Sequence, residues 1–151
     1  MPESESPHGG LPLGRLLTTT AREVSRAFDA ALAAAGGSRS TWLVLLALTT
    51  RRTASQRELA VEVGIQGATL THHLNGMEAD GLLTRRRDPA NRRVHLVELT
   101  DAGRDAFARL RGVAQDHDRR LHAGLDPDDL AAARRVLTLL RTNVEADTGR
   151  V

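Results

Sequence analysis

Two adjacent histidines, His72 and His73, lie in a predicted helix just before a segment rich in arginine. Five arginines fall within the nine residues from Arg85 to Arg93, beside the single acid Asp88. Histidine can bind a metal ion, transfer a proton or contact a base, and arginine binds carboxylates and phosphates. The segment is therefore a candidate for a metal site, a catalytic site or a surface that binds nucleic acid.

The spacing of the histidines argues against a metal site. Adjacent residues on a helix point about 100° apart, so His72 and His73 do not chelate one ion together. Ligands three or four positions apart would be needed, and neither histidine has a usual ligand at those positions. His117 and His122 are five residues apart and also fit a shared ion poorly. We expect neither a metal nor another cofactor.

The sequence also lacks the common signatures of catalysis. It has no cysteine, which excludes disulfides, thiolate ligands and cysteine nucleophiles. It has no Gly-rich phosphate loop, no nucleophile elbow and no helical ligand pair with a general base. We therefore expect a protein that is not an enzyme, although an enzyme built on dispersed histidines and aspartates stays as a remote alternative.

Net charge gives a weaker indication than the isoelectric point suggests. The sequence pI is about 10.7, but the formal net charge is only +2. With no lysine, tyrosine or cysteine, little titrates between histidine and arginine, so a small excess of positive charge persists to high pH. The informative feature is the local basic patch over Arg85 to Arg93. No apolar run approaches the roughly 20 residues that span a bilayer, so we expect a cytoplasmic protein without a membrane partner.

The apolar pattern predicts helices at both ends of the chain. Residues 1–10 have the composition of a disordered tail. A long first helix over about residues 11–35 carries an apolar stripe of Leu13, Leu17, Val24, Phe28 and Ala31. The fifth helix begins after Thr100 as cap and carries Phe107, Leu110, Val113, His117 and Leu121. The sixth begins with Asp126 as cap and Pro127, and carries Leu130, Leu137, Leu140 and Val144.

The middle of the chain contains shorter elements. TWLVLLAL is either a buried helix or a strand, and a helix is favoured because another helix follows closely. In SQRE, Ser55 and Glu58 form a capping box that begins the third helix, which ends at Gly64. The fourth helix runs over about residues 66–80. LLTRR and RVHLVEL are predicted strands on either side of DPAN, which is typical of a hairpin turn.

The fourth helix has two different faces. Leu70, Leu74 and Met77 lie on one side, with His73 at its margin as a hydrogen-bonded residue at the edge of the core. The other side carries Ala68, Thr69, Thr71, His72 and Asn75. In DNA recognition Asn pairs with adenine, His donates to guanine, and the methyl groups of Ala or Thr contact thymine. An ordinary solvated face has the same composition, so the context decides.

The context favours DNA. A capped helix, a glycine turn and a second helix form a helix-turn-helix, and an arginine-rich hairpin follows as a wing. The stretch SQRELAVEVGIQGATLTHHLNGMEADGLLTRRRDPANRRVHLVELTDAG resembles the winged helix-turn-helix core of the MarR family of bacterial transcription regulators. The resemblance spans about Leu11 to Val144, and its most specific part is the wing RRRDPANRRV with the following LT-AG.

The resemblance implies a homodimer that represses transcription from a pseudo-palindromic operator in double-stranded DNA. It further implies that a small, often phenolic or anionic, effector releases the DNA by binding between the dimerisation helices and the core. Residues 66–75 would contain the recognition helix, and Arg92 and Arg93 would be the wing-tip arginines. Two positions depart from the family: Asn91 replaces a common aspartate, and Gly67 replaces a polar contact residue, so base contacts should begin one turn later.

We therefore predict one compact, mainly α domain with a small β-hairpin wing. Residues 38–100 form the winged helix-turn-helix core, and residues 11–37 and 101–147 form dimerisation helices. The expected DNA contacts are Ser55, Gln56, Ala68, Thr69, Thr71, His72, Asn75, Arg85, Arg87, Arg92 and Arg93. An effector is expected near Arg15 and Trp42. The alternative function is a winged-helix module that binds protein and has no specific DNA site.

Overall fold

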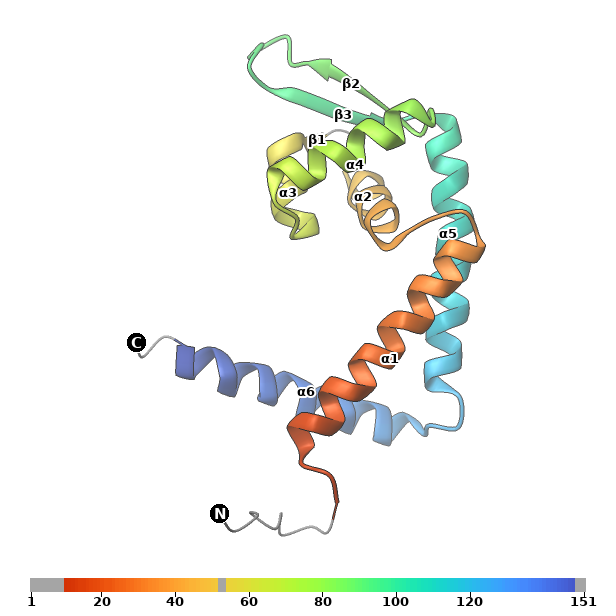
Figure 1. Cartoon of the computed structure of the whole chain (residues 1–151), viewed down its shortest axis with the longest axis vertical. Coiled ribbons are helices and arrows are strands. Elements are labelled where there is room, and N and C mark those ends of the chain that lie inside the picture. Colours follow the sequence, from red (N-terminus) through yellow and green to blue (C-terminus); the bar gives the residue numbers. More distant parts are fainter. Residues whose placement is uncertain (1–9, 52–53, 149–151) are drawn as a thin grey trace. The chain divides into compact units, whose positions relative to one another are not determined.

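The computed structural model describes residues 10–51 and 54–148, so the expected tail over residues 1–10 falls almost entirely outside it. Within this part the chain forms six α-helices and a three-stranded antiparallel sheet (Figure 1). In chain order the elements are α1 (Leu13–Ala34), α2 (Arg39–Thr50), β1 (Ala54–Ser55), α3 (Gln56–Val63), α4 (Gly67–Ala79), β2 (Leu83–Arg87), β3 (His95–Leu99), α5 (Asp101–His122) and α6 (Pro127–Thr148). The predicted mainly helical fold with a small wing is confirmed.

The chain divides into two compact units, residues 1–115 and 116–151, with the boundary inside α5. The sequence predicted one compact domain. This stays a prediction. In the second unit, no side chain of residues 116–146 is buried. The core consists of side chains from the first unit, including Leu32, Leu45, Leu59, Leu70 and Leu110.

Helix α2 is central to the first unit, and this explains its nearly continuous apolar sequence. It contacts α1, α3, α4 and β3, and it buries Val44, Leu45, Ala47 and Leu48. The Ser38 hydroxyl caps its first turn by accepting a hydrogen bond of 3.1 Å from the backbone N–H of Thr41. The helical assignment of TWLVLLAL is confirmed, because an element packed on several sides needs apolar residues around most of its circumference.

Helix α1 joins the core only through its C-terminal half. Leu32 is buried, whereas every residue of its first half up to Glu23 is exposed. Arg39 fixes the C-terminal half to α2 by donating to Asp29 Oδ1 at 2.7 Å and to the carbonyl of Ser25 at 2.8 Å. Within the described ranges no single helix is long and apolar enough to cross a membrane; α1 and α2 together meet that test only as a pair bent by 80°.

The helix-turn-helix consists of α3, the turn at Gly64 and α4. The predicted capping box is present: the Ser55 hydroxyl accepts from the N–H of Glu58, and the Glu58 carboxylate accepts from the N–H of Ser55. Gly64 ends α3 with φ of +70°, in the left-handed region that glycine adopts without a steric penalty. The sharp turn between the two helices is thus encoded locally.

Strand β3 is the middle strand of the sheet and pairs antiparallel with both β1 and β2. The β2–β3 hairpin is the predicted wing, and its register places Arg85 opposite the buried Val97. Strand β1 was not predicted. It has only two residues, too few to show a period of two, and its Ser55 also caps α3. Its pairing with β3, Ala54 opposite Val97 and Ser55 opposite Leu96, sets it apart from a loop.

Thr100 links the base of the wing to the start of α5. It caps this helix, as the sequence predicts. The Thr100 hydroxyl donates to the carbonyl of Gly81 at 2.6 Å and accepts from the N–H of Gly103 at 3.0 Å. The Thr100 N–H donates to the carbonyl of Leu82 at 3.1 Å. Gly103 lies so close to Leu82 that a Cβ there would be 2.0 Å from this same carbonyl oxygen. Only glycine fits this junction without a shift of backbone.

Candidate nucleic-acid interface

Helix α4 has the two faces that its sequence predicts. Leu70, Leu74 and Met77 are buried, and they fix the helix against the core. His73 is half-buried at the margin of this face, and its predicted hydrogen bond stays a prediction. On the outer side Ala68, Thr69, His72 and Asn75 are exposed. Among these polar side chains, Asn75 accepts a hydrogen bond from Arg85.

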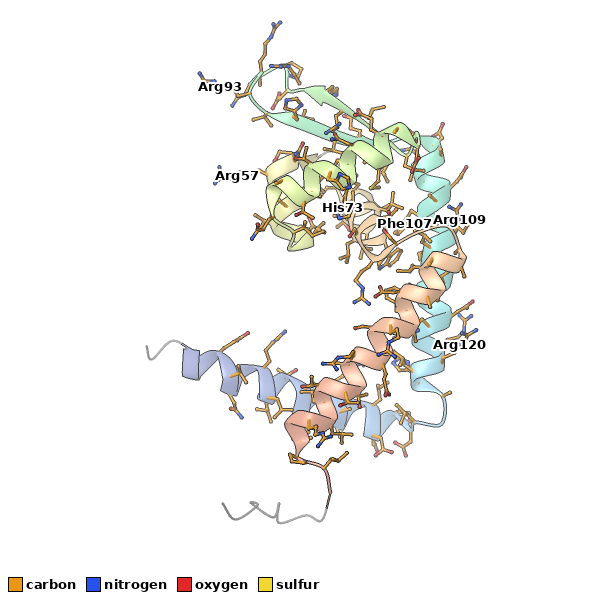
Figure 2. The ribbon with its side chains drawn as sticks, in the orientation of Figure 1. Arg57, His73, Arg93, Phe107, Arg109 and Arg120 are labelled. Atoms are coloured by element: carbon orange, nitrogen blue, oxygen red, sulfur yellow. The ribbon has the colours of Figure 1, made fainter. Side chains whose placement is uncertain are left out.

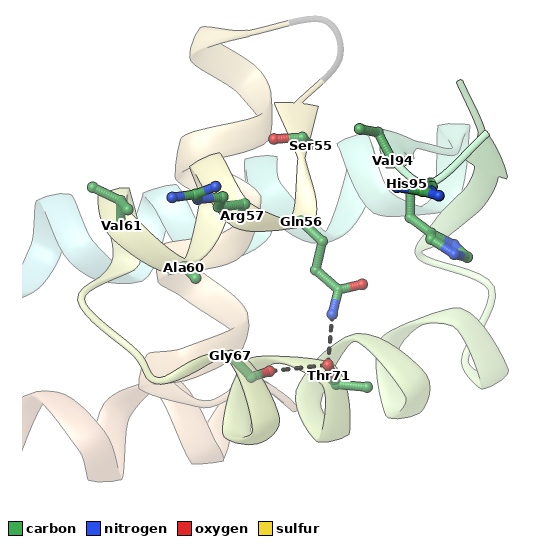
Figure 3. Close-up of a pocket in the computed structure, with 10 residues that line it drawn as sticks. Ser55, Gln56, Arg57, Ala60, Val61, Gly67, Thr71, Val94 and His95 are labelled. Atoms are coloured by element: carbon green, nitrogen blue, oxygen red, sulfur yellow. Dashed lines mark hydrogen bonds between the residues drawn. The ribbon is translucent and has the colours of Figure 1, made fainter. Parts of the chain in front are cut away.

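The N-terminal end of α4 is tied to α3 by a hydrogen-bonded pair. Gln56 Nε2 donates to Thr71 Oγ1 at 2.5 Å, and Thr71 Oγ1 donates to the carbonyl of Gly67 at 2.9 Å (Figure 3). Ser55 lies next to them with its hydroxyl engaged in the capping box. These three predicted DNA-contact residues therefore already have hydrogen-bond partners inside the protein. The bond between Gln56 and Thr71 ties the start of α4 to α3, and Ser55 caps α3.

The C-terminal half of α4 is tied to the wing by Arg85. Its backbone N–H and its Nε donate to the Glu78 carboxylate at 3.1 and 3.0 Å, and its Nη2 donates to Glu78 Oε2 at 2.6 Å. The same Nη2 donates to Asn75 Oδ1 at 2.6 Å. The Arg85 side chain is only 19% exposed. Arg85 was predicted to contact DNA, and the structure places its guanidinium against α4 instead.

The hydrogen bond from the Arg85 side chain holds the pKa of Glu78 below its ordinary value of 4.5, assisted by the charge and backbone N–H of Arg85 and opposed by desolvation. A carboxyl group whose pKa is lower in the folded state stabilises the fold above its unfolded pKa, and this contribution is lost as pH falls through the folded value. We expect the free energy of unfolding to decline less steeply below pH 4.5 in Glu78→Gln than in the wild type.

Urea titrations between pH 3 and 7 measure this difference. Arg85→Gln should flatten the acid decline to the same extent, because it removes the main cause of the lowered Glu78 pKa. In the double variant the acid decline should be no flatter than in either single variant, since both substitutions remove the same interaction. Parallel curves for wild type and Glu78→Gln would show that this carboxylate does not couple folding to pH.

The wing tip is shaped by two side chains that accept backbone hydrogen bonds. Asp88 Oδ1 accepts from the N–H of Ala90 at 2.8 Å, and Asn91 Oδ1 accepts from the N–H of Arg93 at 3.2 Å. Asn91, at the position where the sequence departs from the family pattern, thus orders the backbone of the tip rather than a guanidinium. Within the described residues no carboxylate forms an ion pair with Arg92 or Arg93, and both are exposed. Their charges face solvent.

A groove of about 710 Å³ lies between the start of α3, the first turn of α4 and the wing (Figure 3). Its lining includes Arg57, Arg93 and His95, and it includes no acidic residue. Arg57 extends from α3 on the same side of the core as Arg93 at the wing tip (Figure 2). Sequence reasoning missed Arg57 and His95. The alternation of the wing strand gave no signal for His95, because residues two apart share a face and Val97, two residues further, is buried.

Arg15 and Trp42 are not brought together within this chain. Trp42 stacks on Phe107 with ring centroids 5.6 Å apart, next to the core. Arg15 is exposed on the first turn of α1, and at 1.5 Å per residue it lies about 25 Å along the helix from the buried Leu32. The two residues do not form one effector site in a single copy. Across residues 10–51 and 54–148, no group of three or more histidine or acidic side chains could hold a metal ion.

Comparisons with known proteins agree with this geometry. A profile of the MarR family matches residues 36–94. Over 90 residues, 60% of this chain, the sequence is 31% identical to the uncharacterized HTH-type transcriptional regulator YdgJ of Bacillus subtilis (strain 168). The match covers 55% of YdgJ, so the chain spans about half the length of this relative.

Two solved structures resemble nearly the whole chain. One is a transcriptional repressor, CouR, bound to a 23-mer DNA duplex: the TM-score is 0.77, the identity is 30%, and the match covers 86% of this chain and 92% of CouR. The other is Bordetella bronchiseptica BpsR, whose DNA binding is regulated by 6-hydroxynicotinic acid: the TM-score is 0.73, the identity is 25%, and the coverage is 85% and 98%. The chain therefore belongs to the MarR family of winged helix-turn-helix transcriptional regulators.

Proposed function

We propose that this protein is a homodimeric repressor that binds a pseudo-palindromic operator in double-stranded DNA. The observation that carries the proposal is the exposed face of Ala68, Thr69 and His72 on α4, beside a groove and a wing tip that carry positive charge. These side chains are short and include a donor and methyl groups that suit base edges in the major groove. The similarity to CouR, a repressor bound to DNA, supports the same placement of α4.

In this mode α4 enters the major groove and the wing reaches the adjacent minor groove, where guanidinium groups are favoured. The phosphate strand that separates the two grooves then passes between α4 and the wing. The basic groove lies at that place, and Arg57, Arg93 and His95 are positioned there to face the strand. Phosphate contacts of this kind supply affinity and register, whereas the α4 face supplies sequence preference.

The homodimer is proposed because apolar side chains remain exposed in both units. In the first unit Leu13, Leu16 and Leu17 on α1 are 37–55% exposed. In the second unit Val136, Leu137 and Leu139 on α6 are 47–62% exposed. Apolar surface concentrated on helices outside the core is typical of a protein–protein interface. We assign α1, α5 and α6 to the dimer and residues 38–100 to DNA, so that two copies of α4 contact half-sites about 34 Å apart.

The proposal predicts a dimer that binds one selected duplex far better than a scrambled duplex of the same composition. Selection from random duplexes yields the operator, and fluorescence anisotropy at several salt concentrations gives both affinities. Arg57→Ala should weaken binding to both duplexes and reduce the salt slope by about one if it faces a phosphate. Arg141→Ala on α6, which removes the same charge from an exposed site outside the groove, is the control, with sedimentation to check that this variant is still a dimer.

Two outcomes would contradict the proposal. Sedimentation that shows a folded monomer at micromolar concentration would exclude the homodimer. Equal affinity for selected and scrambled duplexes would exclude specific recognition, and would favour a winged-helix module that binds protein.

We further propose that a small aromatic or anionic compound releases the operator, as 6-hydroxynicotinic acid regulates DNA binding by BpsR. Trp42 is a suitable reporter because it is the only tryptophan and stacks on Phe107 at the junction of α2 and α5. Binding near this junction should change tryptophan fluorescence and lower operator affinity at the same ligand concentration. A panel of aromatic acids that changes neither quantity would count against the effector, and Arg15→Ala tests whether that arginine takes part.

A further inference from the structure

We propose that Arg85 is a positioning residue that fixes the Asn75 side chain, so that the amino group of Asn75 is the part left to contact the operator. This inference rests on the proposed function of α4 in base contact. It differs from the expectation that Arg85 itself contacts DNA, and it changes which chemical group Asn75 offers to a base.

The orientation of the Asn75 amide follows from the chemistry of its neighbour. Arg85 Nη2 lies 2.6 Å from Asn75 Oδ1. A guanidinium group has donors and no acceptor, so the atom of Asn75 that faces it must be the carbonyl oxygen. Because the amide is planar, Nδ2 with its two hydrogens then lies on the other side. Asn75 is exposed, so these two donors are accessible to a ligand.

Glu78 keeps Arg85 in this position. The carboxylate accepts from the backbone N–H, Nε and Nη2 of Arg85 at 2.6–3.1 Å. The backbone of Arg85 is also paired with Val97 in the sheet. Movement of the guanidinium to a phosphate would break the ion pair with Glu78 and the bond to Asn75 together. Through Arg85, the position of strand β2 therefore fixes the orientation of the Asn75 side chain on α4.

The fixed amide predicts a base preference. Bidentate contact with adenine uses the carbonyl and the amino group of asparagine together. Here the carbonyl is held by Arg85, and the amino group is a donor that matches the two major-groove acceptors of guanine, N7 and O6. Cytosine presents a donor at that edge and should be disfavoured. We expect the base pair that faces Asn75 to show guanine over cytosine by about tenfold in affinity.

Arg87 provides a matched comparison on the same strand. It lies two residues beyond Arg85, so both side chains start from the same face of β2. Arg87 is exposed, and its Nη1 donates to the backbone carbonyl of Arg92 at 3.1 Å. No carboxylate in the described part of the chain forms an ion pair with it. Arg87 thus has a charge available for phosphate, whereas Arg85 does not.

The test measures binding of the full chain to the selected operator, to versions with each base pair changed in turn, and to a scrambled duplex. In Arg85→Gln the discrimination at one base pair should fall from about tenfold to about onefold, with unchanged affinity for scrambled DNA and an unchanged salt slope. In Arg87→Gln the salt slope should fall by about one, with base discrimination retained. Circular dichroism and thermal melting check that each variant is folded.

Asn75→Asp keeps the test valid if Arg85→Gln unfolds. An aspartate still accepts from Arg85, so the melting temperature should be maintained, but it has no amino group to donate. Discrimination at the same base pair should be lost. The proposal is overturned if Arg85→Gln lowers the salt slope as Arg87→Gln does, or if Asn75→Asp retains the base preference. Failure of the proposed function would look different, because the wild type itself would not distinguish operator from scrambled DNA.

Discussion

Gly103→Ala is expected to lower the free energy of unfolding by about 3 kcal/mol, although it adds only one methyl group. The new Cβ would lie 2.0 Å from the carbonyl oxygen of Leu82, and this neighbour is backbone, which cannot rotate away as a side chain can. The same carbonyl accepts the N–H of Thr100 at 3.1 Å, so moving it also loosens the attachment of the wing to α5. Operator affinity should fall as well, even though no residue that faces DNA is changed.

Gly112→Ala is the matched control in the same helix. A Cβ at Gly112 meets nothing within 4 Å, and alanine favours the helix over glycine. This variant should therefore be more stable by about 0.5–1 kcal/mol. Urea unfolding at pH 7 measures both variants on one scale. Similar changes in the two variants would mean that the close approach of Gly103 to Leu82 is not what the fold depends on.

Features encoded by neighbouring residues were predicted well from the sequence. The capping box of Ser55 and Glu58, the turn at Gly64 and the start of α6 at Asp126 all depend on hydrogen bonds between residues at most five positions apart. Such bonds need no knowledge of the rest of the fold. The outer face of α4 was predicted for a similar reason, since the helical period alone separates Leu70 and Leu74 from His72.

Features that depend on contacts between segments were not predicted. Arg85 belongs to the run of arginines by composition, and only the pairing of β2 with β3 beside α4 shows that its partner is Glu78. Arg57 stands in the capping-box segment, and only the fold brings it to the same groove as Arg93. Strand β1 likewise exists because β3 lies beside it. An apolar stripe also does not reveal whether it is buried in one chain or between two, so the division of the chain within α5 was not predicted.

The strongest effect on sequence preference is expected from His72, because the Thr71 hydroxyl is already hydrogen-bonded within the protein and Asn75 has only its amino group left to offer. His72→Ala should cost about 1–3 kcal/mol on the operator and much less on scrambled DNA. Its salt slope should be little changed, since a side chain that contacts a base edge neutralises no phosphate. In His72→Ala the preference for one base over another should weaken at the base pairs that face the middle of α4.

Arg92→Ala and Arg93→Ala should show the opposite pattern. Both side chains are exposed at the wing tip, and within the described residues neither is neutralised by a carboxylate. Each substitution should weaken binding to operator and scrambled DNA alike, and should reduce the salt slope by about one for each phosphate that the arginine neutralised. Arg141→Ala serves again as the variant that removes charge elsewhere. If His72→Ala instead lowers both affinities equally, the outer face of α4 is not the surface that selects the operator, because a side chain that contacts base edges must distinguish one sequence from another.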